Sequence, residues 1–177
     1  MNKQTLRMMQ ILFVFNACLL GSVIGLSGME GSPKNLDAKS VNRDLNRAAK
    51  EGNIDVVKSF LTNKETVQLI SKKGAMETLG HAAKKGNLVI VNLILEKLPA
   101  LLDAKSIEAA IWKASRKGNP EVVKVLLGFA KEQNLLDITS LENMKSELKA
   151  LFQEETAGRN RVLTLFDSEI EQIETPN

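Results

Sequence analysis

The chain has 177 residues, of which 44% are hydrophobic and 25% charged, a balance that is typical of globular proteins and excludes intrinsic disorder. Only 4% of the residues are aromatic and Tyr is absent, which favours helices packed through aliphatic side chains. The net charge of +3 is unevenly distributed. Residues 34–131 carry 18 Lys and Arg against 10 Asp and Glu, a net of +8, whereas residues 132–177 carry 4 against 10, a net of −6.

Residues 1–27 are predicted to be a secretory signal peptide. One Lys and one Arg precede an apolar run over residues 11–26, which is shorter than the roughly 18 residues that a spanning helix needs. Small residues before Gly28 fit a cleavage site, and residues 28–35 are expected to be a linker. The alternative is an uncleaved membrane anchor. We therefore expect export from a bacterium, to the periplasm or the medium, with membrane contact only through this segment.

Three copies of a unit of about 33 residues are predicted over residues 36–134. LDAKSVNRDLNRAAKEGN at residues 36–53 aligns without a gap with LDAKSIEAAIWKASRKGN at residues 102–119. Between them, TLGHAAKKGN at residues 78–87 repeats the second half of the motif. Self-similarity at this period predicts a solenoid of stacked units.

Each unit is predicted to be a pair of antiparallel helices. The first helix has a narrow apolar stripe, which in the first unit consists of Leu45, Ala48 and Ala49. A Gly follows that can end the helix, because only Gly adopts the left-handed conformation without steric cost. Asn or Pro then begins a second helix with paired apolar residues, such as Val56 and Val57. The three glycines are Gly52, Gly86 and Gly118.

This pattern, L-x-x-A-A-x-x-G-N-x-x-V-V-x-x-L-L, resembles the ankyrin repeat over residues 36–129. The resemblance implies an all-α, ankyrin-like solenoid of antiparallel helix pairs. Two features of the family are missing: its Thr-Pro-Leu-His helix start, which reads Arg-Asp-Leu-Asn at residues 43–46, and its Gly-Ala-Asp hairpin loop. These departures weaken the expectation of projecting β-turn fingers but not that of the helix pairs.

Residues 135–177 are predicted to form a degenerate fourth repeat that caps the stack. LLDITSLE at residues 135–142 echoes LLDAKSIE at residues 101–108. One helical stripe is expected from Leu141 to Phe152, a turn at residues 157–160, and a second stripe from Val162 to Ile173. The outer face is rich in Glu, as a terminal repeat must present a polar surface to water.

No catalytic, cofactor-binding or metal-binding constellation is recognisable in the sequence. His81 is the only histidine; it lies four residues after Glu77, and we interpret it as a surface residue loosely paired with that Glu rather than a general base. One His and one Cys are too few for a metal site, and a phosphate-binding Gly-Lys loop is absent. We predict a protein that is not an enzyme and uses no cofactor.

The resemblance implies binding of another protein through the concave face, by the ends of the first helices and the loops before them. Carried over to this sequence, the helix-end positions are Lys50, Glu51, Lys84, Lys85, Arg116 and Lys117, and the loop positions are Lys39, Lys73 and Lys105. If they form a basic column, the partner is acidic and the affinity falls with salt. The alternative is that these cations only suit the ends of helices or are solvated. Trp112 is either an interface anchor or a packing residue against the fourth unit.

Two functions follow from the resemblance and the expected export. The first is an exported protein-binding module, which the family resemblance associates with effectors directed at a host. The second is a periplasmic or membrane-tethered inhibitor, immunity or scaffold protein. Nucleic-acid binding is suggested only by the basic repeats and is not expected, because aromatic residues for base stacking are scarce.

Overall fold

The computed structural model describes residues 37–152 and 156–174, so the predicted signal peptide and linker lie outside the described residues. Nine α-helices, one 3-10 helix and no β-strand occur in this part of the chain. None of the helices searched there is long and apolar enough to cross a membrane. The elements in order are α2 (Ala38–Glu51), α3 (Ile54–Thr62), α4 (Lys64–Leu69), α5 (Lys72–Lys85), α6 (Leu88–Lys97), η1 (Pro99–Leu101), α7 (Ala104–Arg116), α8 (Pro120–Glu132), α9 (Ile138–Leu151) and α10 (Ala157–Glu174).

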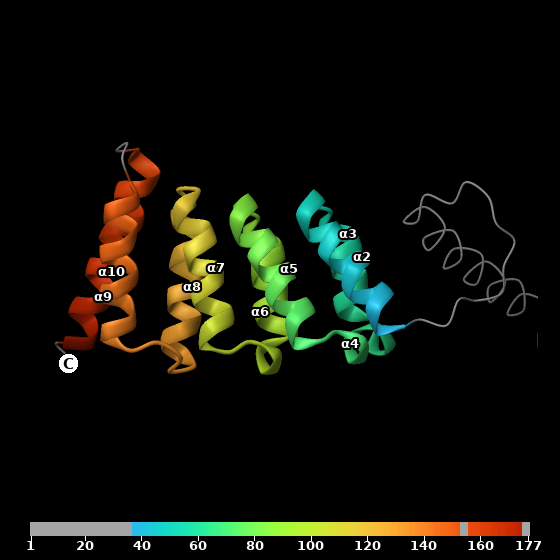
Figure 1. Cartoon of the computed structure of the whole chain (residues 1–177). Coiled ribbons are helices and arrows are strands. Elements are labelled where there is room, and N and C mark those ends of the chain that lie inside the picture. Colours follow the sequence, from blue (N-terminus) through green and yellow to red (C-terminus); the bar gives the residue numbers. More distant parts are fainter. Residues whose placement is uncertain (1–36, 153–155, 175–177) are drawn as a thin grey trace, which may run out of the picture. The chain divides into compact units, whose positions relative to one another are not determined.

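The helices form four antiparallel pairs, α2/α3, α5/α6, α7/α8 and α9/α10, stacked side by side in chain order (Figure 1). The first helices of the first three pairs, α2, α5 and α7, pack closely on one another and form an inner layer. The second helices, α3, α6 and α8, form an outer layer. The predicted all-α solenoid of helix pairs is confirmed.

Small buried side chains explain the close packing of the inner layer. Leu45, Leu79 and Ile111 are fully buried at equivalent positions, and the Ala residues around them leave room for the neighbouring helix. The outer helices contribute paired aliphatic residues, of which Val57 and Val91 are also fully buried. The apolar stripes predicted from helical spacing therefore form one continuous core.

The bends between the two helices of the first three pairs have the predicted backbone. Gly52, Gly86 and Gly118 have φ of 82°, 74° and 68°, a region that side chains rarely adopt. The Asn after each Gly donates its backbone N–H to the carbonyl oxygen five residues earlier, at 2.9, 3.0 and 3.1 Å. This bond pattern satisfies carbonyl groups that a helix end leaves unpaired.

The first helix of each pair begins with a repeated cap. Asp37, Asp103 and Asp137 each accept the backbone N–H of the Ser three residues later, at 2.8, 2.9 and 2.8 Å. In the second pair Ser71 takes this place and accepts the N–H of Gly74 at 3.0 Å. These bonds satisfy free N–H groups at the helix start and fix where each helix begins.

Two connections differ from the family's hairpin fingers. A short helix, α4, joins the first two pairs and a 3-10 turn, η1, joins the next two. Asn63 caps α4 by accepting the N–H of Glu65 at 2.8 Å. The described residues thus replace projecting β-turns with compact helical turns, in keeping with the missing Gly-Ala-Asp loop.

The prediction for the fourth unit was wrong in two details. The expected turn at residues 157–160 is the first turn of α10, which begins at Ala157. The stripes are also shorter than expected, because Leu151 is 51% exposed and Ile173 is 38% exposed. Leu141, Leu148, Val162 and Phe166 do form the predicted buried contacts between α9 and α10.

Candidate functional site

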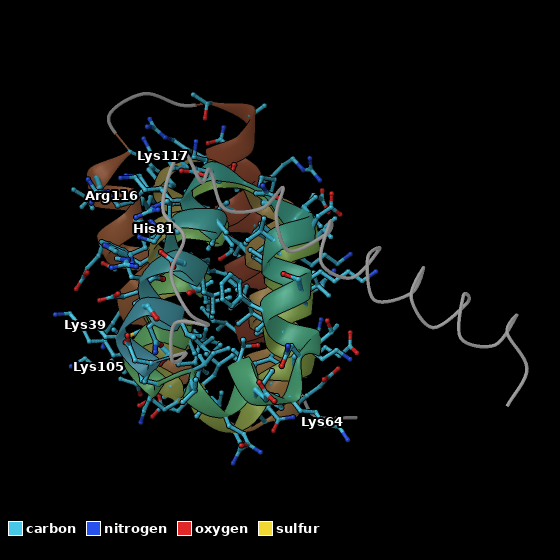
Figure 2. The ribbon with its side chains drawn as sticks, turned by 90° about the vertical axis from the view of Figure 1, so that its right-hand side faces the viewer. Lys39, Lys64, His81, Lys105, Arg116 and Lys117 are labelled. Carbon is cyan, nitrogen blue, oxygen red and sulfur yellow. The ribbon has the colours of Figure 1, made fainter. Side chains whose placement is uncertain are left out.

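The predicted helix-end residues lie at the ends of the three inner helices. Lys50 and Glu51 end α2, Lys84 and Lys85 end α5, and Arg116 and Lys117 follow one another at the end of α7; all six are exposed. Figure 2 shows Arg116 and Lys117 on the same side as Lys39 and Lys105, with Lys64 on the opposite side. We call the exposed surface of α2, α5 and α7 the inner face.

The three residues expected in loops lie in helices instead. Lys39, Lys73 and Lys105 are exposed residues in the first turns of α2, α5 and α7. The sequence reading was wrong because the Asp and Ser caps start these helices one or two residues before each Lys. Lys73 also has a local partner, since its Nζ lies 3.9 Å from Glu77 Oε1.

Four cations that lie together near the ends of α5 and α7 form no ion pair with another described residue. They are Lys84, Lys113, Arg116 and Lys117, and each is exposed. Elsewhere on the stack cations do find acids, as where Lys72 Nζ lies 2.7 Å from Asp103 Oδ2. The inner face near the end of α7 therefore carries uncompensated positive charge.

Lys113 belongs to this cluster and was not predicted. Its side chain lies across α5 at Gly80, where a Cβ would come within 3.1 Å of Lys113 Cδ. Its spacing in the sequence could have revealed it, because Lys113 lies three residues before Arg116 and four before Lys117. Residues at these spacings share one face of a helix. A Gly on the neighbouring helix makes the space.

His81 is half-buried on the same face. Burial is the main reason that the pKa of its imidazole lies below the ordinary 6.5, and the positive charges of Lys113 and Lys50 lower this pKa further. Glu77 raises the pKa of His81, but less than burial and the two Lys residues lower it. The Glu77 carboxylate accepts a hydrogen bond from Asn46 Nδ2 at 2.7 Å. The expected loose pairing of His81 with Glu77 is thus a minor influence on the ring.

A groove separates α7 from α9. The α9 helix packs mainly on α10 and contacts α7 at few positions, unlike the closely packed inner layer. Two hollows lie along this groove, of ≈ 530 and ≈ 410 Å³, and Trp112 lines both. The Trp112 ring is half-buried and packs against the core. The one side chain therefore packs against the core and also lines the groove.

The larger hollow, which we call the basic hollow, is rich in cations. Its basic lining consists of Lys84, Lys113, Arg116, Lys117 and Arg159. The rings of Trp112 and Phe152 complete much of the wall, and the Arg159 guanidinium lies 5.2 Å from the centre of the Phe152 ring. No carboxylate lines it among the described residues. Phe152 and Arg159 come from the fourth unit and were not predicted as site residues.

The second hollow, which we call the Met144 hollow, is less charged. Met144, Ala109 and Trp112 form its apolar lining. Its charged lining consists of Lys105, Glu108 and Glu147, one cation against two carboxylates. The groove is therefore strongly basic at one end and carries a small net negative charge at the other.

Within the described residues, no three His, Cys, Asp or Glu side chains are grouped so that they could hold a metal ion. The chemistry that the inner face offers is positive charge beside apolar and aromatic surface. That combination suits recognition of an anionic partner more than the positioning of a reacting group.

Comparison with known proteins gives one match. A family model described as ankyrin repeats, in three copies, matches residues 45–138. The matched span runs from α2 to the first residue of α9 and so covers three helix pairs and more than half of the chain. No curated protein and no solved structure matches the chain.

Proposed function

We propose, because the chain belongs to the ankyrin-repeat family, that it is a protein-binding module whose partner docks on the inner face. Ankyrin repeats are generally protein-protein interaction modules and typically have no catalytic activity. A stack whose repeats contact their neighbours through a continuous core supplies a firm surface for such binding. The observation that carries the proposal is the group of exposed, unpaired cations at Lys84, Lys113, Arg116 and Lys117.

The partner surface is proposed to be acidic. A cation at the last turn of a helix is favourable by itself, which could account for Lys84 and Arg116 without any partner. The same dipole disfavours cations in a first turn, yet Lys39, Lys73 and Lys105 lie there in three successive inner helices. The helix dipole therefore explains the cations in the last turns but not those in the first turns. An acidic partner accounts for the cations at both ends of the inner helices.

Charge reversal tests this proposal. The triple variant Lys84→Glu, Lys85→Glu, Arg116→Glu is compared with a matched variant of the outer surface, Lys58→Glu, Lys64→Glu, Lys124→Glu, whose three residues are also exposed. Affinity capture from the native source is expected to lose its specific partner with the first variant and keep it with the second. Equal capture by both variants, with unchanged circular dichroism, would contradict binding through the inner face.

Export is the second part of the proposal. It is supported by the basic start and apolar run of residues 1–27, which lie outside the described residues. If the protein leaves the cell, its partner is a host or extracellular protein and an effector role follows. If it stays in the periplasm or is tethered to the membrane, an inhibitor, immunity or scaffold role follows. Fractionation, with the mass of the mature N-terminus, separates these cases, and a wholly cytosolic protein with an intact N-terminus would contradict export.

A further inference from the structure

The groove between α7 and α9 exists because the fourth unit departs from the repeat. The stripes of α2, α5 and α7 are built from Ala and Ser at the positions that face a neighbour, which lets backbones approach. The α9 helix presents Met144 to the groove, and α7 presents the large ring of Trp112. Large side chains on both helices keep α9 away from α7, so the hollows are built into the packing.

We propose that this groove binds a linear acidic segment of the partner, with one bulky apolar side chain seated in the Met144 hollow against Trp112. The inference rests on the proposed function, because it names the part of the partner that the inner face recognises. The basic hollow takes the acidic residues, and the apolar residue follows along the groove. The occupant is argued from charge complementarity and from the two different linings of one groove.

Charge selects the ligand at the basic hollow. Lys113, Arg116 and Lys117 lie at the end of α7, beside Lys84 at the end of α5. Carboxylates placed among them would meet cations from two helices, and Arg116 pairs well with carboxylates through its planar fork of donors. The partly enclosed walls of Trp112 and Phe152 reduce screening by water and salt.

The Met144 hollow selects the apolar residue of the peptide. The apolar lining of the Met144 hollow consists of Met144, Ala109 and Trp112. A flexible Met and a large ring form a surface that adapts to an aliphatic or aromatic side chain. The volumes of ≈ 530 and ≈ 410 Å³ are within the range of about 300 to 1,000 Å³ that is usual for ligand-binding hollows. A short extended peptide can occupy both.

The selection experiment uses the full chain, immobilised and exposed to a displayed library of random linear peptides. Peptides enriched on the wild type are expected to contain a run of Asp or Glu next to Leu, Ile, Met or Phe. The double variant Lys113→Glu, Lys117→Glu is expected to bind them about tenfold more weakly or worse, whereas Lys58→Glu, Lys64→Glu keeps full binding. The proposal would be overturned if the enriched peptides lacked acidic residues. It would also be overturned if the wild type enriched no peptide more strongly than the variant Lys113→Glu, Lys117→Glu does.

The fluorescence of Trp112 reports on the groove directly. It is the only Trp and the chain has no Tyr, so its emission arises from this one site. Titration with the enriched peptide is expected to shift and saturate the emission, with an affinity that falls as salt rises. Replacing the apolar residue of the peptide with Ala is expected to weaken binding about tenfold. Unchanged emission at saturating peptide would place the ligand elsewhere and overturn the assignment.

Filling the Met144 hollow tests whether the apolar side chain of the peptide binds there, and it removes no packing residue. Ala109→Lys puts a long side chain into the hollow, and Ala150→Lys makes the same change on the exposed side of α9. The first is expected to lose the peptide and the second to keep it. Equal binding to both would overturn the seat for the apolar residue.

Two further comparisons fix the class of ligand and separate this inference from the proposed function. If oligouridylate binds as tightly as the peptide and is lost with the same variants, the groove selects phosphate and the acidic-peptide assignment fails. If charge reversal abolishes capture of the native partner while the library yields no groove-dependent peptide, only this inference fails. If charge reversal leaves capture unchanged, the proposed function itself fails.

Discussion

The backbone of Gly158 lies directly against the carbonyl of Gly118, so close that a Cβ on Gly158 would be 2.6 Å from Gly118 O. In the first two bends an Asn from the following repeat fills this place: a Cβ on Gly52 would meet Asn87 at 3.7 Å, and one on Gly86 would meet Asn119 at 3.0 Å. The first turn of α10 thus closes the row of bends where another repeat would otherwise continue it. The close approach explains why a turn-forming Gly stands inside a helix.

We expect Gly158→Ala to destabilise the protein by about 1 to 3 kcal/mol, because the added methyl meets backbone that cannot move aside as a side chain could. The gain in helix propensity from Gly to Ala, up to about 1 kcal/mol, offsets only part of this. The midpoint of urea unfolding, followed by circular dichroism, measures the change.

Gly128→Ala is the matched control for this substitution. Gly128 lies inside α8, and nothing is within 4 Å of the place where its Cβ would be. Only the propensity effect then remains, so the variant is expected to be more stable by about 0.5 to 1 kcal/mol. Equal effects of the two substitutions would show that the contact between Gly158 and Gly118 is not tight in solution.

Ser115 is a second position where a small change should raise stability. It occupies the place of Ala49 and Ala83 in the other repeats, is fully buried, and its Oγ has no hydrogen-bond partner. A buried hydroxyl without a partner costs about 1 to 3 kcal/mol. Ser115→Ala is therefore expected to raise the free energy of unfolding by that amount. Ser146→Ala, at an exposed position of α9, measures the propensity effect alone, and an equal gain there would refute the explanation by burial.

The helix caps predict how stability depends on pH. The bond from the Ser40 N–H lowers the pKa of Asp37 below 3.8, the Ser140 N–H does so for Asp137, and the pKa of Asp103 is lowered chiefly by Lys72. A carboxyl with a lowered pKa binds its proton less readily when folded, so its contribution to stability is complete above about pH 4 and is lost as the pH falls through the lowered values.

The measurement is urea unfolding at pH 7, 4, 3 and 2.5. The urea concentration at half unfolding is expected to fall from pH 4 to pH 2.5. It should fall less in the variant Asp37→Asn, Asp103→Asn, Asp137→Asn, because Asn can accept the same cap bonds without titrating. An equally steep fall in the variant would assign the acid sensitivity to other carboxyls.

Local patterns predicted the helix pairs well. The Ala stripe around Leu45 and the Gly at residue 52 act over one or two turns, so their meaning is present in the sequence itself. The helix starts could also have been placed, because Asp-x-x-Ser at Asp37, Asp103 and Asp137 is a recognisable cap. That signal was missed, and Lys39 and its counterparts were assigned to loops instead.

The groove and its lining were beyond the reach of periodicity. Phe152 and Arg159 are brought beside Trp112 only by the way α9 and α10 pack, which depends on the volumes of several side chains at once. The same holds for Gly158, whose partner Gly118 is 40 residues away. Such contacts follow from tertiary packing, and a single sequence without solved relatives carries little signal for them.

His81 offers a last test, because the only histidine in the chain gives a single titrating imidazole signal in proton NMR. Burial, followed by the charges of Lys113, Lys50 and Lys84, lowers the pKa of His81, while Glu77 opposes them. The titration midpoint is therefore expected below 6.5. In Lys113→Met it should rise without reaching 6.5, since burial, the largest cause, remains. Because protonation is disfavoured in the folded state, stability should also fall as the pH drops below 6.5 toward this midpoint.

The same signal connects the electrostatics of the inner face with its proposed ligand. An acidic peptide in the basic hollow would neutralise part of the positive potential near Lys113 and Lys84, which both lower the pKa of His81. Saturating peptide should then raise the titration midpoint of His81, even though the imidazole itself does not line the hollow. In Lys113→Met the rise should be smaller, because one of the charges to be neutralised is missing. A midpoint unmoved by bound peptide would mean that the acidic residues lie away from this end of the groove.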